Sequence, residues 1–313
     1  MNSNLIEELR KCAIEELFST SFSAVWEESW RDTFMKKIEN KVNGKNIFNM
    51  GDSLSELFQS TSKGRNQSSV SGGGYKWECL VCWYLNLCLI GTRTVVIKQK
   101  KNLVPKPLKE AIAVYYGNFR SDTEADLIAI SFPNDESYLT NIDELLIRDC
   151  SGELIPNYVK NKINRSELLD FLIDRDFEKV SINIIQCKTN WNDNAQIPML
   201  WDMIYSADSF VSNRIQIGGN GFSIKNLADF KYSFVTVPTN KEEYTPTKTA
   251  VQRVRNLSGG NFWGRESLND TASSIKEIFN RNFKSSQSST RLITNLDLEL
   301  EKINTVYDYF KLG

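Results

Sequence analysis

The sequence predicts an α/β fold in which a central mixed β-sheet is flanked by helices, with additional helices at both ends of the chain. Short runs rich in valine and isoleucine alternate with longer segments whose apolar side chains recur every three or four positions. The chain has 313 residues, of which 41% are hydrophobic and 25% are charged. This is enough apolar material for a complete core without disulfide bonds or structural metal ions.

Residues 1–70 are predicted to form an N-terminal helical part. Residues 4–40 carry apolar side chains at helical spacing, and a short helix is expected at 52–59. The polar, glycine-rich segment 59–74 is expected to be a loop. Its glycines at 72–74 precede a helix, so their backbone amides could cradle a phosphate, with simple flexibility as the alternative.

Residues 71–240 are predicted to form the core. Strands are expected where β-branched and apolar residues run together, at 93–99, 125–132, 179–189 and 231–237. Helices are expected at 75–89, 106–116 and 196–212. Residues 134–178, with a helix expected at 166–175, are interpreted as an insertion between two neighbouring strands. This insertion could be a specificity element, a dimer arm or decoration.

Residues 241–313 are predicted to form a C-terminal loop and helices that pack on the core. The segment 251–267 contains a Ser-Gly-Gly turn at 258–260 with arginines on both sides. Helices are expected at 270–283 and 296–310, with a polar linker between them.

The chain contains no histidine. This excludes zinc sites, catalytic triads and cysteine dyads that use histidine, and nuclease mechanisms that rely on a histidine base. A hydrolase without histidine must work with carboxylates, lysine and a hard cation. The formal net charge is only −1, so any affinity for DNA has to come from local basic patches.

The sequence also indicates a cytoplasmic protein without membrane association. Its first residues mix acidic with apolar side chains, unlike a signal peptide, and no run of about 18 apolar residues occurs. The six cysteines are scattered and are interpreted as small buried side chains in a reducing compartment. Cys79 and Cys82 have the spacing of a redox motif, but they lie inside a predicted helix, so redox chemistry is the weaker interpretation.

Two predicted strands place polar side chains at equivalent edges of the sheet. Gln186 and Lys188 end an apolar run and share one face of their strand. A lysine in that position is unfavourable unless an anion or an open cleft receives it, and a solvated strand end is the alternative. Asp126 stands where a loop enters the neighbouring apolar run.

Glu78 adds a fourth polar residue, as the one acid of an otherwise apolar helix. A functional carboxylate is one interpretation. The alternative is a buried ion pair with Lys76 or a neighbouring arginine.

These residues resemble the active-site motif of the PD-(D/E)XK nuclease superfamily, in a type II restriction endonuclease-like form with glutamine in place of the acid. The family pattern is an aspartate at the start of one strand and an acid, a spacer and a lysine on the next. Asp126 matches the first element, and Gln186-Cys187-Lys188 matches the second. Glu78 matches the glutamate that an upstream helix supplies in many members. The resemblance covers residues 71–240 and implies a restriction-endonuclease-like core.

The resemblance implies a magnesium-dependent endonuclease for which Mn²⁺ is a substitute. Asp126, the Gln186 side-chain oxygen and the Cys187 backbone carbonyl would bind the metal. Lys188 would hold or help to deprotonate the attacking water. Glu78 would bind a second, weaker metal or orient metal-bound water. Because an amide replaces an acid, one firmly held ion is expected rather than two.

Two segments are expected to contact double-stranded DNA. One directly follows the catalytic strand, where asparagine can read base edges and tryptophan can stack, although the segment is also a good turn sequence. The other is the arginine-flanked turn, for which a solvated basic loop is the alternative. The candidate residues are Asn190, Trp191, Asn192, Arg253, Arg255 and Arg265.

The expected function is that of a sequence-specific type II restriction enzyme in a prokaryotic cell. A homodimer is expected, because symmetric cutting of a duplex needs two active sites. The alternatives are a defence or repair nuclease of low specificity and a DNA-binding module whose nuclease site has decayed.

Overall fold

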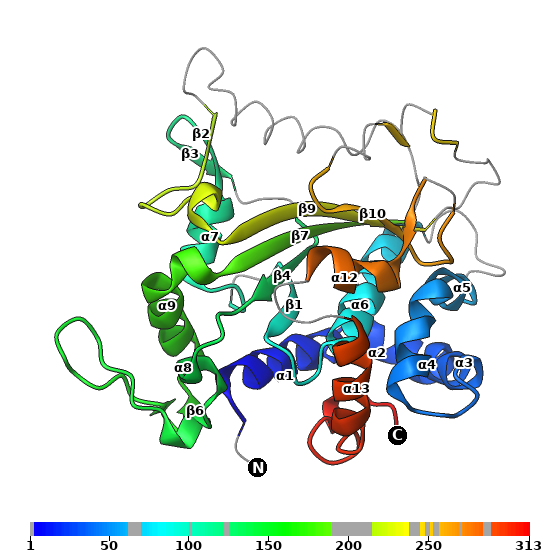
Figure 1. Ribbon diagram of the computed structural model, residues 1–313, viewed down its shortest axis with the longest axis horizontal. Coiled ribbons are helices and arrows are strands. Elements are labelled where there is room, and N and C mark those ends of the chain that lie inside the picture. The colour runs from blue at the N-terminus through cyan, green and yellow to red at the C-terminus, as the bar shows by residue number, and fades with distance from the viewer. Residues whose placement is uncertain are drawn as a thin grey trace.

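The computed structural model describes residues 3–61, 70–99, 102–121, 125–189, 215–237, 245–247, 251–252, 257–268, 271–283 and 289–313. At its centre lies a six-stranded sheet with the order β1-β4-β7-β9-β10-β11 (Figure 1). The strands are β1 (Thr94–Lys98), β4 (Leu127–Ser131), β7 (Ser181–Lys188), β9 (Asp229–Thr236), β10 (Gly260–Trp263) and β11 (Ser273–Ser274). Strands β1, β4 and β7 are antiparallel neighbours, whereas β7, β9, β10 and β11 run parallel. The predicted α/β class, with a mixed central sheet flanked by helices, is confirmed.

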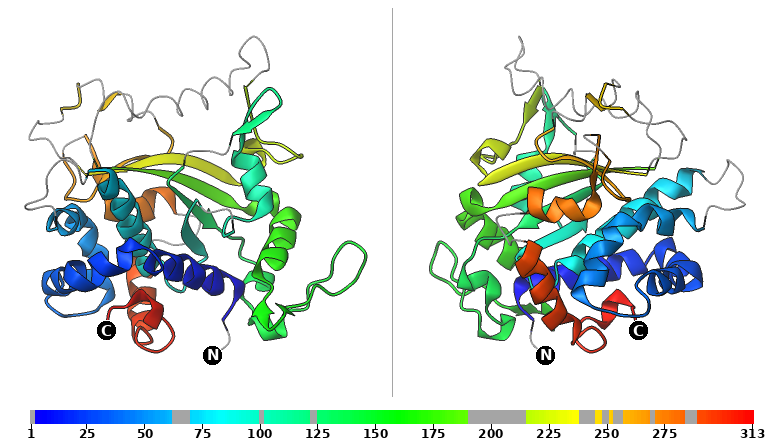
Figure 2. Two further views of the ribbon diagram at one scale, coloured as in Figure 1. Left: turned by 180° about the vertical axis from the view of Figure 1, so that it is seen from behind. Right: turned by 45° about the vertical axis from the view of Figure 1, so that its right-hand side comes forward.

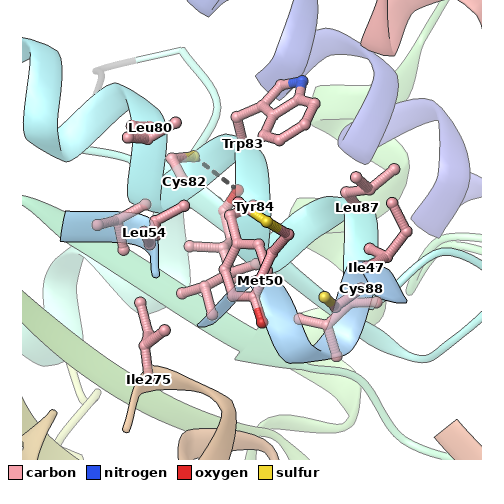
Figure 3. Close-up of a cluster of buried hydrophobic side chains, with 14 of the residues drawn as sticks. Ile47, Met50, Leu54, Leu80, Cys82, Trp83, Tyr84, Leu87, Cys88 and Ile275 are labelled. Atoms are coloured by element: carbon pink, nitrogen blue, oxygen red, sulfur yellow. Dashed lines mark hydrogen bonds between the residues drawn. The ribbon is translucent and has the colours of Figure 1, made fainter. Parts of the chain in front are cut away.

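One face of the sheet is covered by α6 (Val70–Cys88), most of whose side chains from Trp77 onward are buried. Alternate strand residues such as Val96, Leu127 and Ile185 belong to the same apolar cluster. Figure 3 shows α6 side chains packed against others from residues 44–59 and against Ile275. Among the described residues, no helix has the length and apolarity needed to cross a membrane.

Helix α6 begins at Val70 rather than at the predicted start at residue 75. The glycines at 72–74 therefore lie in the helix, and the predicted loop is wrong at these positions. Each glycine disfavours a helix by about 1 kcal/mol. Packing of the apolar residues that follow supplies more than this, so the helix extends back through the glycines.

The opposite face of the sheet packs against α7 (Lys106–Ile112), α9 (Arg165–Arg175) and the first half of α1 (Leu5–Phe18). The strand residues on this face alternate with those under α6 and include Ile182 and Ile184. Both faces of β7 are thus buried, as its near-continuous apolar sequence predicts.

Strands β4 and β7, which lie on either side of residues 134–178 in the chain, pair directly. The intervening residues form α8 (Glu136–Leu139), a helical turn η4 (Ile142–Glu144), the hairpin β5 (Tyr158–Val159) and β6 (Lys162–Ile163), α9, and a turn η5 (Phe177–Lys179). The predicted helix at 166–175 corresponds to α9. Figure 2 shows this insertion beside the start of α1 and at the opposite end of the molecule from the helices of residues 31–59.

The predicted helix at 106–116 is partly wrong. Helix α7 ends at Ile112, and the next residues form β2 (Val114–Tyr116). Strand β2 pairs with β3 (Phe119–Ser121) and with β8 (Ile215–Ile217) in a separate three-stranded sheet. The partner β8 lies about a hundred residues further along the chain, so this pairing was not visible in the local pattern. A helical turn η6 (Ile224–Asn226) separates β8 from β9.

The terminal helices are shorter than predicted. In place of one helix at 4–40, the chain forms α1, α2 (Ser21–Val25), a π-helical turn η1 (Trp26–Trp30) and α3 (Arg31–Lys37). Thr20 interrupts the run because its hydroxyl accepts a hydrogen bond from Phe22 N and so starts a new helix. Helix α4 (Gly44–Asn49), a turn η2 (Met50–Asp52) and α5 (Leu54–Gln59) follow, and α5 confirms the short helix predicted at 52–59.

The C-terminal helices also differ from the prediction. The chain forms β11, a turn η7 (Ile275–Glu277) and α12 (Ile278–Asn282), because residues 273–274 pair with β10. Helix α13 (Ser289–Leu300) lies earlier than the predicted 296–310, and only a turn η8 (Asp308–Phe310) occurs near the end.

Helices from both ends of the chain share the hydrophobic core with α6. The rings of Trp26 and Trp83 lie 4.2 Å apart, and their indole nitrogens donate to Lys311 O and Phe310 O at 3.0 and 3.1 Å. Arg10 of α1 is fully buried and donates to Thr92 O and Thr94 O just before and at the start of β1. The three predicted parts of the chain therefore have a common core.

Candidate functional site

Asp126 lies directly before β4 and connects that strand to the end of β7. Its Oδ2 accepts a hydrogen bond from Gln186 Nε2 at 2.6 Å and another from Cys187 N at 2.7 Å. Its Oδ1 accepts no hydrogen bond from the residues that the structure describes. The predicted juxtaposition of Asp126 with Gln186 and Cys187 is therefore present.

The register of the strands explains why this edge is open. Leu127 pairs with Ile185, and β4 begins there, so the last three residues of β7 extend beyond it. The N–H and C=O of one residue in an extended strand point to the same side. Since Cys187 N–H points to Asp126, the Cys187 carbonyl faces the same space beyond the end of β4.

Gln186 is held at both ends of its amide group. The side chain is 5% exposed, its nitrogen donates to Asp126, and its Oε1 accepts from the Tyr232 hydroxyl at 3.3 Å. An ionised carboxylate can only accept, which fixes the amide nitrogen toward Asp126. In this arrangement the Gln186 oxygen, the predicted metal ligand, points to Tyr232 and away from the carboxylate.

Lys188 ends β7 and is partly buried. Val237 N donates to Lys188 O at 2.9 Å, which keeps this end of the strand paired to the chain after β9. The Lys188 ammonium group is close enough to Asp126 to lower the pKa of that carboxyl group.

Glu78 of α6 forms an ion pair with Lys98, the last residue of β1. Among the described residues, Glu78 therefore forms the ion pair of the alternative interpretation, with Lys98 in place of the expected Lys76 or arginine. The Lys98 side chain is 11% exposed and that of Glu78 is 20% exposed. Lys98 Nζ also lies 4.0 Å from the centre of the Tyr75 ring. The site thus contains two carboxylates, Glu78 and Asp126, and two ammonium groups, Lys98 and Lys188. Its net formal charge is zero.

Burial raises the pKa of Asp126 from its ordinary value of 3.8 to about 6. The Cys187 N–H opposes this rise, the negative charge of Glu78 adds to it, and the cations of Lys188 and Lys98 oppose it. Asp126 is thus mostly ionised at neutral pH, and the Cys187 N–H and the two lysines favour that charged form.

The cysteines of α6 behave as apolar core residues. Cys79 and Cys82 are fully buried and are not bonded to each other. Burial raises the pKa of the Cys79 thiol to about 11 and that of Cys82 further. Reactive thiols have lowered pKa values, so the redox interpretation is not supported.

Five of the six predicted DNA-contacting residues lie outside the described residues. These are Asn190, Trp191, Asn192, Arg253 and Arg255, and the helix expected at 196–212 lies there too. The sixth, Arg265, has its guanidinium 5.0 Å from the centre of the Trp263 ring. Trp263 is fully buried in β10, so this part of the segment 251–267 is a strand of the central sheet.

Sequence reasoning did not single out Lys98 or Tyr232. Lys98 ends the run TVVIK much as Lys188 ends IIQCK, so the same argument about a lysine closing an apolar strand would have found it. Tyr232 gave no such signal. It reaches Gln186 only because β7 and β9 are neighbours.

Among the described residues, no three His, Cys, Asp or Glu side chains come together as metal ligands. Within the part of the chain that the structure describes, a metal site at this edge would draw on amide and backbone oxygens besides Asp126. No protein-family model matches the chain, and no curated protein sequence does. The site's own geometry is thus the basis for a functional proposal.

Proposed function

We propose that this protein is a metal-dependent endonuclease that hydrolyses phosphodiester bonds of double-stranded DNA on a PD-(D/E)XK-like core. The observation that carries the proposal is the junction in which Asp126 accepts hydrogen bonds from Gln186 and Cys187, next to Lys188. A largely buried carboxylate with a raised pKa in such a place is typical of functional sites, because it is unfavourable for stability alone.

The sheet supports this proposal. The resemblance requires the strand of the aspartate and the strand of the glutamine and lysine to be neighbours, and β4 and β7 pair directly. It also requires an upstream helix to bring a glutamate near, and Glu78 acts on the pKa of Asp126.

The groups at the junction fit one hard cation. Asp126 Oδ1 accepts no hydrogen bond from the described residues, and the Cys187 carbonyl faces the same space. The Gln186 amide can add its oxygen if it turns over, because the Tyr232 hydroxyl can accept as well as donate a hydrogen bond. Bound there, Mg²⁺ would polarise a phosphate oxygen and make a water molecule more acidic. With one carboxylate in the set, binding is weaker than at an all-carboxylate site, and Mn²⁺ is a suitable substitute.

The side chains of the protein have separate tasks in hydrolysis, which adds water across one P–O bond. Asp126 supplies the negative charge that holds the cation. Lys188 holds the attacking water and offsets the charge of the phosphate. Glu78 is close enough to Asp126 to raise the pKa of that carboxyl group, but it forms an ion pair with Lys98.

Within this class, we propose a sequence-specific restriction enzyme that acts as a homodimer, since symmetric cutting of a duplex needs two active sites. A defence or repair nuclease of low specificity would use the same site. The orientation of Gln186, whose nitrogen faces Asp126, also favours a second candidate, a DNA-binding module with a decayed site.

Incubation of the purified protein with long duplex DNA and Mg²⁺ or Mn²⁺ tests the proposal. Discrete fragments are expected, and a smear would instead indicate low specificity. Binding without cleavage at any concentration of either ion would favour the decayed site. The absence of both binding and cleavage would contradict the proposal.

A further inference from the structure

Lys98 is placed beside the candidate site by the end of β1. It pairs in register with Leu127, the residue after Asp126, and Gln99 N donates to Asp126 O at 3.3 Å. Its side chain lies on the α6 side of the sheet with Val96, whereas Lys188 alternates with Cys187 and so points to the other side. The two lysines thus flank Asp126 from opposite faces.

The contacts of Lys98 fix its ammonium group in place. Glu78 pairs with it, and the face of the Tyr75 ring lies 4.0 Å away. Both contacts come from successive turns of α6, which is anchored in the core. Neither charged side chain is fully buried, so both have some contact with solvent.

We infer that Lys98 is a second phosphate-binding cation of the site, and that Glu78 is a positioning residue that acts through Lys98 rather than as a metal ligand. This inference rests on the proposed function. The ammonium group of Lys98 offsets the charge of Glu78, which makes Glu78 a weaker cation ligand than Asp126, whereas the other N–H groups of Lys98 can still donate to a phosphate. A phosphate between the two lysines would be contacted by one lysine from each side of Asp126. Both contacts would strengthen as the charge of the phosphate increases toward the transition state.

The first test measures binding of a short duplex at several salt concentrations with Ca²⁺, which keeps the site charged while limiting hydrolysis. Lys98→Met should reduce the slope of log affinity against log salt by about one unit, because one phosphate contact is lost. Lys98→Arg should retain the slope. In Mg²⁺, Lys98→Met should cut about 100-fold more slowly, in line with loss of one transition-state donor.

The second test separates the two roles of Glu78. Titration calorimetry with Mg²⁺ in the absence of DNA should give Glu78→Gln the affinity of the wild-type protein, while the salt slope of DNA binding falls. The double variant Lys98→Met/Glu78→Gln leaves no unpaired charge, which protects its fold. It should match Lys98→Met in DNA binding, because Glu78 acts only through the lysine.

Lys37→Met and Glu56→Gln are matched controls, since these residues form an ion pair at 2.5 Å between α3 and α5. Both controls should keep the wild-type salt slope and Mg²⁺ affinity. An unchanged salt slope in Lys98→Met, or a Mg²⁺ affinity at least tenfold weaker in Glu78→Gln, would overturn the inference while leaving nuclease activity in place. Wild-type protein that neither binds nor cuts duplex DNA would overturn the proposed function and this inference together.

Discussion

The Gln186 side-chain nitrogen donates to Asp126 Oδ2 at 2.6 Å, so an amide occupies the position where a second carboxylate would repel the first. This hydrogen bond stabilises the ionised form of Asp126, although the surroundings raise the pKa of that carboxyl group to about 6. It also leaves the site with less negative charge for a cation than an all-carboxylate site has. If the site binds metal as we propose, replacing Gln186 with a carboxylate should lower the stability of the metal-free protein and raise its affinity for metal.

The first prediction concerns the stability cost of Asp126. Its pKa rises from 3.8 unfolded to about 6 folded. Below pH 3.8 the carboxyl group is protonated in both states, and its contribution to stability is fully present. As pH rises, the unfolded chain releases this proton before the folded protein does. The contribution is therefore lost by the time pH has risen through about 6. Asp126→Asn, whose oxygen can accept the same two hydrogen bonds, should be more stable than wild type by about 2–3 kcal/mol at pH 8. The difference should vanish near pH 4. Urea unfolding across this range measures it.

Asp32→Asn is the control for the substitution itself, because the Asp32 side chain is 72% exposed. A stability difference between Asp126→Asn and wild type that stays constant from pH 4 to pH 8 would contradict the raised pKa of Asp126.

The second prediction concerns Gln186→Glu. Two adjacent carboxylates would destabilise the metal-free protein, because like charges oppose each other and the donor to Asp126 is lost. A divalent cation between them would reverse this effect. We expect a lower melting temperature than wild type in chelator, recovery in Mg²⁺, and cleavage at a lower Mg²⁺ concentration.

Thermal unfolding with and without Mg²⁺ measures this directly. Complete loss of activity with an intact fold would show that the amide performs a task that a carboxylate cannot, such as donating a hydrogen bond to substrate.

The third prediction concerns Lys188. Lys188→Met keeps much of the apolar stem and removes the charge, so DNA binding should be largely retained while cleavage falls by about 100-fold or more. Single-turnover rates and binding isotherms on one duplex measure the two effects. Lys179→Met is a suitable control, because Lys179 is 65% exposed and pairs with Asp176. Cleavage by Lys188→Met at the wild-type rate would remove Lys188 from the active site.

The fourth prediction concerns the buried Arg10, which attaches α1 to the start of β1. Its guanidinium is fully buried and also bonds Glu7 and Asn86. Arg10→Met should destabilise the whole protein by about 3–5 kcal/mol, because it leaves Glu7 and two carbonyl groups without their partner. Unfolding should remain a single transition if the N-terminal helices share the core of the sheet. The exposed Lys11→Met is the control. A separate early transition would indicate that residues 1–70 unfold independently.

The juxtaposition of Asp126 with Gln186 was predictable from the sequence, because side-chain alternation and burial act locally along each strand. The sequence could not show which way the Gln186 amide faces, since Asp126 before β4 accepts from its nitrogen and Tyr232 of β9 donates to its oxygen. Lys98 was predictable in principle, but its pairing with Glu78 depends on how α6 crosses β1.

Long-range contacts also account for the errors in the fold. Residues 114–116 leave the predicted helix to pair with β8, and Trp263 is buried because β10 lies beside β9. In both places, strand pairing over a long sequence separation outweighs the local pattern.

Cleavage of supercoiled plasmid by wild type and Asp126→Asn, side by side in Mg²⁺ and in chelator, tests the central claim most directly. Wild-type protein should convert the plasmid to linear fragments in Mg²⁺ only. Asp126→Asn, although at least as stable, should bind the plasmid and leave it intact. Equal cleavage by both proteins, or wild-type cleavage in chelator, would contradict a metal-dependent nuclease centred on Asp126.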